Sequence, residues 1–154
     1  SPKLILFEYG NDVIHSKELI SSLNISKYVT WLPIMPRKFL IQAMTHATFV
    51  ADQFRDGMSA TSAGTTNEAL AAGVPVITNT DGSIFDPNDP YHGAPILQSL
   101  SADDIYHHFK QYSITPDYYK DLGQSGQRWF KDNLGVGLAK AYLELLQNCK
   151  SQNN

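Results

Sequence analysis

The sequence is poor in cysteine and in charge. Its one cysteine, Cys149, cannot build a disulfide framework or a cysteine-rich zinc site. Charged residues make up 18% of the chain, and 12 Lys and Arg against 15 Asp and Glu give a net charge of -3. Nucleic-acid modules that work by counterion release need a basic face, so we expect no nucleic-acid partner. The single cysteine and the lack of an export signal indicate a cytoplasmic protein.

Long apolar runs are lacking as well. No run approaches the roughly 18 apolar residues that cross a bilayer, so no transmembrane segment is expected in this chain. The hydrophobic fraction of 42% is nevertheless typical of a folded protein, and 154 residues correspond to one domain. We expect a single domain over residues 1–150 and a disordered tail at 151–154. The start at Ser1-Pro2-Lys3, on the edge of a predicted strand, indicates one domain of a longer protein.

Strand and helix patterns alternate through the first half of the sequence. Short apolar runs predict four strands, and apolar stripes predict the helices between them. The strands are expected at residues 3–7, 28–32, 48–51 and 75–78, and the helices at 16–23, 36–47 and 65–72. Strands joined by single helices form a parallel sheet. The expected fold class is α/β, a Rossmann-like parallel sheet flanked by helices, with C-terminal helices.

Three helices are predicted after residue 100, the first of them capped at Ser101. In the second helix, the spacing of Tyr118 and Trp129 is typical of core packing. The third carries a stripe of apolar residues that recur at helical spacing. His107 and His108 are neighbours on the first of these helices, so we expect them to point apart at the surface or partly buried.

The loop before the third predicted helix is the richest in candidate ligand groups. Ligands of open parallel sheets bind beyond the carboxyl ends of the strands. Gly64 lets a ligand approach the backbone, and Thr65 and Thr66 open a helix whose first amides lack partners within the helix. This positive helix end suits a diphosphate. Glu68 lies in the first turn, where its carboxylate can accept two hydrogen bonds from the vicinal diol of a ribose. These features predict a nucleotide-sugar site.

The same residues also match a capping box. In the pattern Thr65-x-x-Glu68, the threonine is the N-cap and the glutamate closes back onto the helix start. The box pattern alone gives both interpretations similar weight, and they are compatible in part because both organise the same helix end. The role of Glu68 therefore stays open between ribose binding and capping.

The segment from Glu68 to Ile77, EALAAGVPVI, is similar to the Glu-Ala-hydrophobic-Ala-x-Gly-x-Pro-Val-Ile block of GT-B glycosyltransferases. Other segments resemble one retaining branch of that family, the glycosyl transferases group 1 or family 4-like enzymes. They are Asp52-Gln53-Phe54 with Gly57, Ala94-Pro95-Ile96, Ser101 to Ile105, Leu122-Gly123 and Gly126 to Trp129. The resemblance covers most of the chain, from Lys3 to Leu146.

The resemblance implies a C-terminal, donor-binding domain. Glu68 would hold the donor ribose, the turn and helix start from Gly64 to Thr66 would hold the diphosphate, and the loop with Ile34 would contact the base through its backbone. Asp52 belongs to the same predicted donor-binding set. The implied activity, which fits polysaccharide biosynthesis, transfers a sugar from a nucleoside diphosphate to an acceptor hydroxyl with retention, without a metal or other cofactor. The acceptor, a glycan, lipid or protein, would bind an N-terminal domain outside this chain.

One departure from the family pattern concerns the catalytic residues. Retaining members usually carry a second glutamate eight residues before the ribose glutamate, where this sequence has Ala60. No catalytic residue is therefore assigned. Two other functions stay open: a nucleotide-sugar 2-epimerase, which shares the two-domain plan, and a non-catalytic nucleotide- or sugar-binding module, which Ala60 and the absent half favour.

Overall fold

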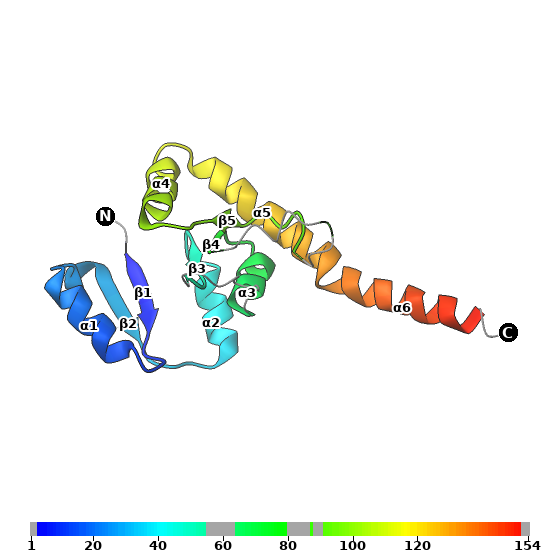
Figure 1. Ribbon diagram of the computed structural model, residues 1–154, viewed down its shortest axis with the longest axis horizontal. Coiled ribbons are helices and arrows are strands. Elements are labelled where there is room, and N and C mark those ends of the chain that lie inside the picture. The colour runs from blue at the N-terminus through cyan, green and yellow to red at the C-terminus, as the bar shows by residue number, and fades with distance from the viewer. Residues whose placement is uncertain (1–2, 55–63, 80–86, 88–90, 152–154) are drawn as a thin grey trace. The chain divides into compact units, whose positions relative to one another are not determined.

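The computed structural model describes residues 3–54, 64–79, 87 and 91–151 (Figure 1). The chain divides into two compact units, residues 1–40 and 41–154, and the boundary falls within helix α2 (Arg37–Met44). Each unit is described by itself. The single domain predicted over residues 1–150 stays a prediction. Of the predicted tail, Ser151 is the last residue of a helix and residues 152–154 lie outside the described part.

The first unit is a two-stranded parallel sheet with one helix against it. Its elements are β1 (Leu4–Phe7), α1 (Val13–Ser22), the short 3-10 helix η1 (Ser26–Tyr28) and β2 (Val29–Leu32). Leu4 lies opposite Val29 in the ladder between the strands. Lys17 of α1 forms an ion pair with Glu8 and lies over the ring of Trp31, 5.2 Å from its centroid. These two contacts tie the helix to β2 and to the residue that follows β1.

The second unit holds a three-stranded parallel sheet in the order β3-β4-β5. The strands are β3 (Val50–Ala51), β4 (Val76–Thr78) and β5 (Leu97–Gln98). The central strand β4 is buried throughout, with Val76 fully enclosed. The four predicted strands are present with shorter bounds, but they belong to two parallel sheets and not to the one sheet predicted, and β5 is an addition. A strand of only two residues is too short to show an alternation of apolar and polar side chains, which is why it was not predicted from the sequence.

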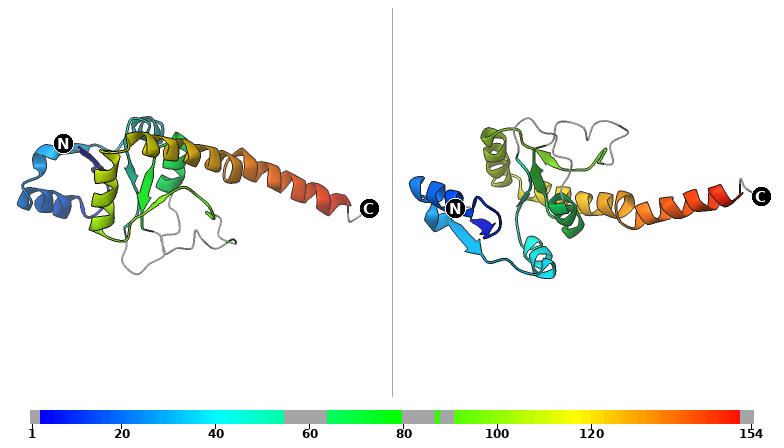
Figure 2. Two further views of the ribbon diagram at one scale, coloured as in Figure 1. Left: turned by 90° about the horizontal axis from the view of Figure 1, so that it is seen from above. Right: turned by 60° about the horizontal axis from the view of Figure 1, so that its bottom comes forward.

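Helices α3 (Gly64–Ala72), α4 (Ala102–Tyr112), α5 (Pro116–Asn133) and α6 (Val136–Ser151) complete the second unit (Figure 2). The predicted stop of α3 at Gly73 is confirmed, because this residue has a φ of +74°. Its N–H donates to the Leu70 carbonyl, and the Val74 N–H donates to the Ala69 carbonyl, each at 3.0 Å. This is a Schellman ending, which needs the left-handed conformation that glycine adopts without strain.

Helix α5 lies directly against α3 and its ending. A methyl group built on Gly123 would lie 2.2 Å from the Gly73 carbonyl oxygen, and one on Gly126 would lie 2.9 Å from a methyl carbon of Leu70. The Gln127 side-chain amide also donates to the Ala71 carbonyl at 2.9 Å. The absence of side chains at these two positions of α5 therefore fixes where α3 sits.

The core aromatic residue of α5 is Tyr119, not Tyr118 as the spacing predicted. Tyr119 is 3% exposed and packs edge-to-face on Phe49 with ring centroids 5.2 Å apart, whereas Tyr118 is 57% exposed. The reason is that the close packing of Gly123 and Gly126 selects the buried face of α5, and Tyr119 lies one turn before Gly123 on that face. Trp129 is half-buried and packs on a loop tyrosine described below.

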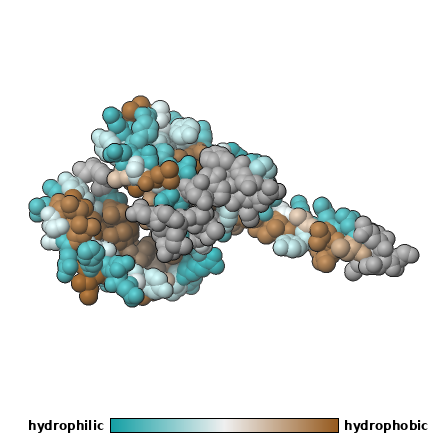
Figure 3. Space-filling view, in the orientation of Figure 1, coloured by the Kyte–Doolittle hydropathy of each residue, from teal (hydrophilic) through white to brown (hydrophobic). Residues whose placement is uncertain are grey.

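Helix α6 carries the predicted apolar stripe, but its side chains are exposed. Figure 3 shows apolar and polar side chains interspersed along it. Exposed apolar residues on this helix are Leu138, Tyr142, Leu145 and Leu146. Within the part of the chain that the structure describes, no helix combines the length and apolar character needed to cross a lipid bilayer.

Candidate functional site

The carboxyl ends of β3 and β4 lie side by side, and polar residues follow both of them. The Asp52 N–H donates to the Ile77 carbonyl at 3.0 Å, and the Asn79 N–H donates to the Gln53 carbonyl at 2.9 Å. These bonds extend the ladder just beyond the strands. Asp52 and Asn79 therefore lie at the carboxyl ends of the strands, where α/β folds bind their ligands.

The side chain of Asp52 holds the start of α3. Its Oδ2 atom accepts hydrogen bonds from the Thr66 N–H at 3.0 Å and from the Thr66 hydroxyl at 2.5 Å. Thr66 is fully buried. Without Asp52, its backbone N–H and its hydroxyl would be buried without an acceptor, which would lower the stability of the fold. Sequence reasoning placed Asp52 in the donor-binding set and missed this role, because 14 residues separate the two partners.

Among the residues that the structure describes, none takes up the amides of Gly64 and Thr65 at the start of α3. The first amides of an α-helix have no partner within the helix, and Asp52 takes up the one on Thr66. Gly64 is exposed, and a methyl group built on it would meet no described atom within 4 Å. The amides of Gly64 and Thr65, at the positive end of the helix dipole, can therefore receive an anion.

Glu68 shares a face of α3 with this helix start. It follows Gly64 by four residues and Thr65 by three, spacings that place side chains on one side of a helix. Its side chain is half-buried, while Thr66, Ala69 and Leu70 occupy the buried side. Thr65 is the second residue of α3, so it is not the N-cap that the capping-box interpretation requires. Asp52 performs that task from outside the helix.

A further group of side chains lies beside the first turn of α3. The Tyr91 hydroxyl donates to Asn67 Oδ1 at 2.9 Å, and the Tyr91 ring stacks on Trp129 with centroids 5.9 Å apart. The Trp129 indole N–H donates to the His92 carbonyl at 3.3 Å. This bridge from loop to helix was not predicted, since Tyr91 lies in a polar loop without periodicity. It brings the Tyr91–His92 segment next to the candidate anion site.

The structure thus brings together Asp52, the stretch Gly64 to Thr66 and Glu68. Ile34 lies in the first unit, in the segment after β2, where its side chain is 68% exposed, and its predicted contact with a base stays a prediction. Ala60, the position of the departure from the family pattern, lies outside the described residues. Among the described residues, no three His, Cys, Asp or Glu side chains gather as metal ligands would.

Solved structures share this fold at low sequence identity. HepE from Anabaena, in complex with UDP-glucose, aligns with a TM-score of 0.71 and 16% identity over 95% of this chain. Sucrose-phosphate synthase from Thermosynechococcus elongatus aligns with a TM-score of 0.69 and 14% identity over 95% of the chain. The pneumococcal O-GlcNAc transferase GtfA, in complex with UDP and GlcNAc, aligns with a TM-score of 0.57 and 14% identity, also over 95%.

These neighbours are glycosyltransferases of the GT-B type. The chain has the fold of a GT-B glycosyltransferase domain. The prediction of an α/β, Rossmann-like fold with C-terminal helices is thereby confirmed. The chain spans 41% of HepE, 39% of the sucrose-phosphate synthase and 29% of GtfA. No protein-family model matches the sequence, and no curated protein matches it significantly.

Proposed function

We propose that this chain binds the nucleoside-diphosphate sugar of a glycosyltransferase at the start of α3. The observation that carries the proposal is the juxtaposition of the available amides at Gly64 and Thr65 with Glu68 on one helix face. Asp52 holds that helix start at the carboxyl end of the sheet. HepE, which shares the fold, has been solved with UDP and with UDP-glucose, which supports this donor class.

Each part of the donor would meet a group of matching chemistry. The amides of Gly64 and Thr65 would receive the diphosphate, and Glu68 would accept hydrogen bonds from the ribose hydroxyls. Asp52 would act as a positioning residue through Thr66, since its carboxylate repels phosphate. When the bond from the anomeric carbon to the diphosphate oxygen breaks, the departing diphosphate gains negative charge. The dipole of α3 would stabilise that charge in place before the reaction.

The rest of the proposal concerns the whole enzyme. The anomeric carbon would form its new bond to an acceptor hydroxyl, whose proton leaves to a base. We propose retention of configuration, no metal requirement and a cytoplasmic site of action. The chain covers 39% to 41% of two neighbours, so the acceptor, a glycan, lipid or protein, would bind a region beyond these residues.

Calorimetric titration with UDP, GDP and ADP tests donor binding. Glu68→Ala should lower the affinity for the nucleotide at least about tenfold, because hydrogen bonds to charged groups contribute about 1.5–3 kcal/mol. Glu144→Ala, which removes the same charge from an exposed position of α6, is the matched control and should leave affinity unchanged. Equal affinity in the two variants, or no binding of any of the three nucleotides at millimolar concentration, would refute the assignment.

Product analysis with the full-length protein separates binding from turnover. NMR of the reaction with UDP-glucose and a mixture of glycan acceptors should show a new glycoside whose anomeric configuration matches the donor. A 2-epimer of the sugar would instead identify an epimerase. Tight UDP binding without any product would identify a non-catalytic binding module.

A further inference from the structure

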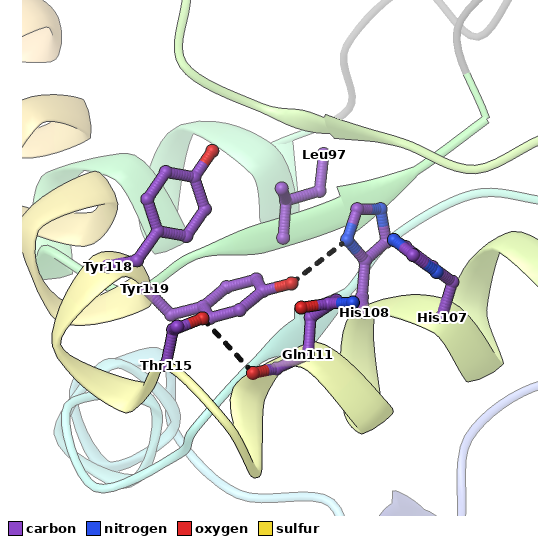
Figure 4. Close-up of a pocket in the computed structure, with 7 residues that line it drawn as sticks. All are labelled: Leu97, His107, His108, Gln111, Thr115, Tyr118 and Tyr119. Carbon is purple, nitrogen blue, oxygen red and sulfur yellow. Dashed lines mark hydrogen bonds between the residues drawn. The ribbon is translucent and has the colours of Figure 1, made fainter.

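The second unit also has a pocket at the ends of its strands that lie opposite the α3 site. A pocket of about 340 Å³ opens between α4, the first turn of α5 and the start of β5 (Figure 4). Its wall includes Leu97, the first residue of β5. Its buried Tyr119 packs on Phe49, which immediately precedes β3. The pocket is therefore at the amino ends of the strands, whereas Asp52 and the start of α3 are at the carboxyl ends.

Helix α4 supplies one side of this pocket and α5 the other. Figure 4 shows Gln111 and both histidines of α4 across from the tyrosines of α5. His107 and His108 were expected to point apart, yet both border the pocket, with ring centroids 6.2 Å apart. The angle between adjacent helical residues is only about 100°, which lets two large rings flank one recess. His108 Nδ1 lies 3.4 Å from the Tyr119 hydroxyl.

The rim of the pocket is held by the turn between the two helices. The Thr115 hydroxyl, just before α5, donates to the backbone carbonyl of Gln111 at 3.2 Å. The rings of Tyr118 and Tyr119 meet edge-to-face with centroids 5.1 Å apart. Burial raises the pKa of Tyr119 above its usual value, in agreement with its place in the pocket wall. The recess is thus a built feature of the α4–α5 corner.

The described lining residues offer hydrogen-bonding groups and aromatic faces but no carboxylate, ammonium or guanidinium group. None of the described residues that line the pocket is Asp, Glu, Lys or Arg. The imidazoles, the Gln111 amide and the Tyr118 hydroxyl offer both donors and acceptors, and the tyrosine rings offer apolar faces. A sugar ring presents the complementary pattern, with hydroxyl groups around its edge and C–H groups on its faces. The volume lies near the small end of the range for ligand pockets, which limits the occupant to about one ring.

We propose that this pocket binds a neutral monosaccharide, separately from the nucleotide site at α3. The probes are glucose, galactose, mannose and N-acetylglucosamine, added one at a time while the imidazole and tyrosine ring signals are followed by NMR. The expected result is a saturable shift of the His107 and His108 signals at millimolar concentration with at least one of the four. UDP should shift the Gly64 and Thr65 amides instead, so this proposal and the proposed function can fail independently.

Two tyrosine variants decide whether the shifts arise at the pocket. Tyr118→Ala should lower the affinity for the sugar that shifts the histidine signals about fivefold, because it removes an aromatic face from the pocket. Tyr142→Ala, an equal truncation at a 62% exposed position on α6, should leave the affinity unchanged. If circular dichroism shows that Tyr118→Ala fails to fold, Gln111→Ala takes its place with the same expectation.

Three results would overturn the proposal. The first is the absence of a saturable shift with all four sugars. The second is unchanged sugar affinity in the folded pocket variant. The third is a shift with adenosine, added as a flat heterocycle, when none of the sugars produces one. That last result would assign the pocket to aromatic heterocycles.

Discussion

The first backbone amides of α3 and of α4 have no partner within their own helix, and the two helix starts are capped in different ways. At α4, the amides of Leu100 and Ser101 both donate to Asp104 Oδ2 at 2.9 Å, and the Asp104 N–H donates back to the Ser101 hydroxyl at 3.2 Å. This capping box is contained within five consecutive residues. At α3, the partner of the Thr66 amide is Asp52, which belongs to the end of a strand. One helix start is closed by its own sequence and the other by the tertiary structure.

The difference explains why only one of the two ends is a candidate anion site. A carboxylate that folds back over its own helix start occupies the place where an anion would bind. Asp104 does this at α4. Asp52 instead engages the third residue of α3, so within the described residues the amides of Gly64 and Thr65 are left for a ligand. An external cap positions a helix end while preserving its ability to bind.

The largest effect should come from displacing α3 through α5. Gly123→Ala places a methyl group 2.2 Å from the Gly73 carbonyl oxygen, so the two helices must separate. We expect a loss of roughly 2–3 kcal/mol in the free energy of unfolding, because overpacking outweighs the small gain in helix propensity. Urea denaturation measures this loss. Gln124→Ala, at the neighbouring exposed position, should be nearly neutral, and an equal loss there would contradict the explanation.

Removing the external cap should have a smaller effect that separates two roles of Asp52. Asp52→Ala leaves the buried donors of Thr66 unpaired and should cost about 1–3 kcal/mol of stability. Asp52→Asn keeps an acceptor oxygen and removes a negative charge near the proposed diphosphate site. Its UDP affinity, measured by calorimetry, should equal or exceed that of the native protein. A marked loss of affinity with a stable Asp52→Asn fold would instead support direct donor binding by the carboxylate.

The smallest effect should appear at α4 as a dependence of stability on pH. Hydrogen bonds from the Ser101 side chain and then from the Leu100 amide lower the pKa of Asp104 from its ordinary value of 3.8. Because the folded pKa is the lower one, this stabilisation is complete above the ordinary value and is lost as the pH falls through the folded pKa. Urea midpoints measured on acidification should show this loss. It should disappear in Asp104→Asn and persist in Asp103→Asn, which alters the adjacent exposed carboxylate.

Much of the fold and part of the site follow from the sequence because they rest on local signals. Apolar periodicity located the strands and helices, Ser101 marked the start of α4, and Gly73 marked the end of α3. The candidate anion site followed from the glycine and threonines that open a helix after a strand. The features that were not predicted depend on contacts between residues that are far apart in the sequence. Asp52 caps a residue 14 positions away, and Tyr91 contacts Asn67 of α3 and Trp129 of α5.

The buried face of α5 was not predicted for the same reason. Apolar spacing alone could not show that Gly123 and Gly126 face α3, since glycine adds nothing to a hydrophobic pattern. The adjacent histidines of α4 are exposed (His107) and half-buried (His108), as predicted, but the pocket that both border was not predicted. Their position on a helix was predicted correctly, but the concave corner that both rings border exists only once α5 is packed in place.

The two tryptophans fall one in each unit, in different surroundings. Trp31 lies under the ammonium group of Lys17 in the first unit, and Trp129 stacks on Tyr91 in the second. Each unit therefore contains its own intrinsic fluorophore. With Trp31→Phe, the emission of the remaining indole reports the unfolding of residues 41–154, and with Trp129→Phe it reports residues 1–40. The order in which the two units melt can thus be read without any added label.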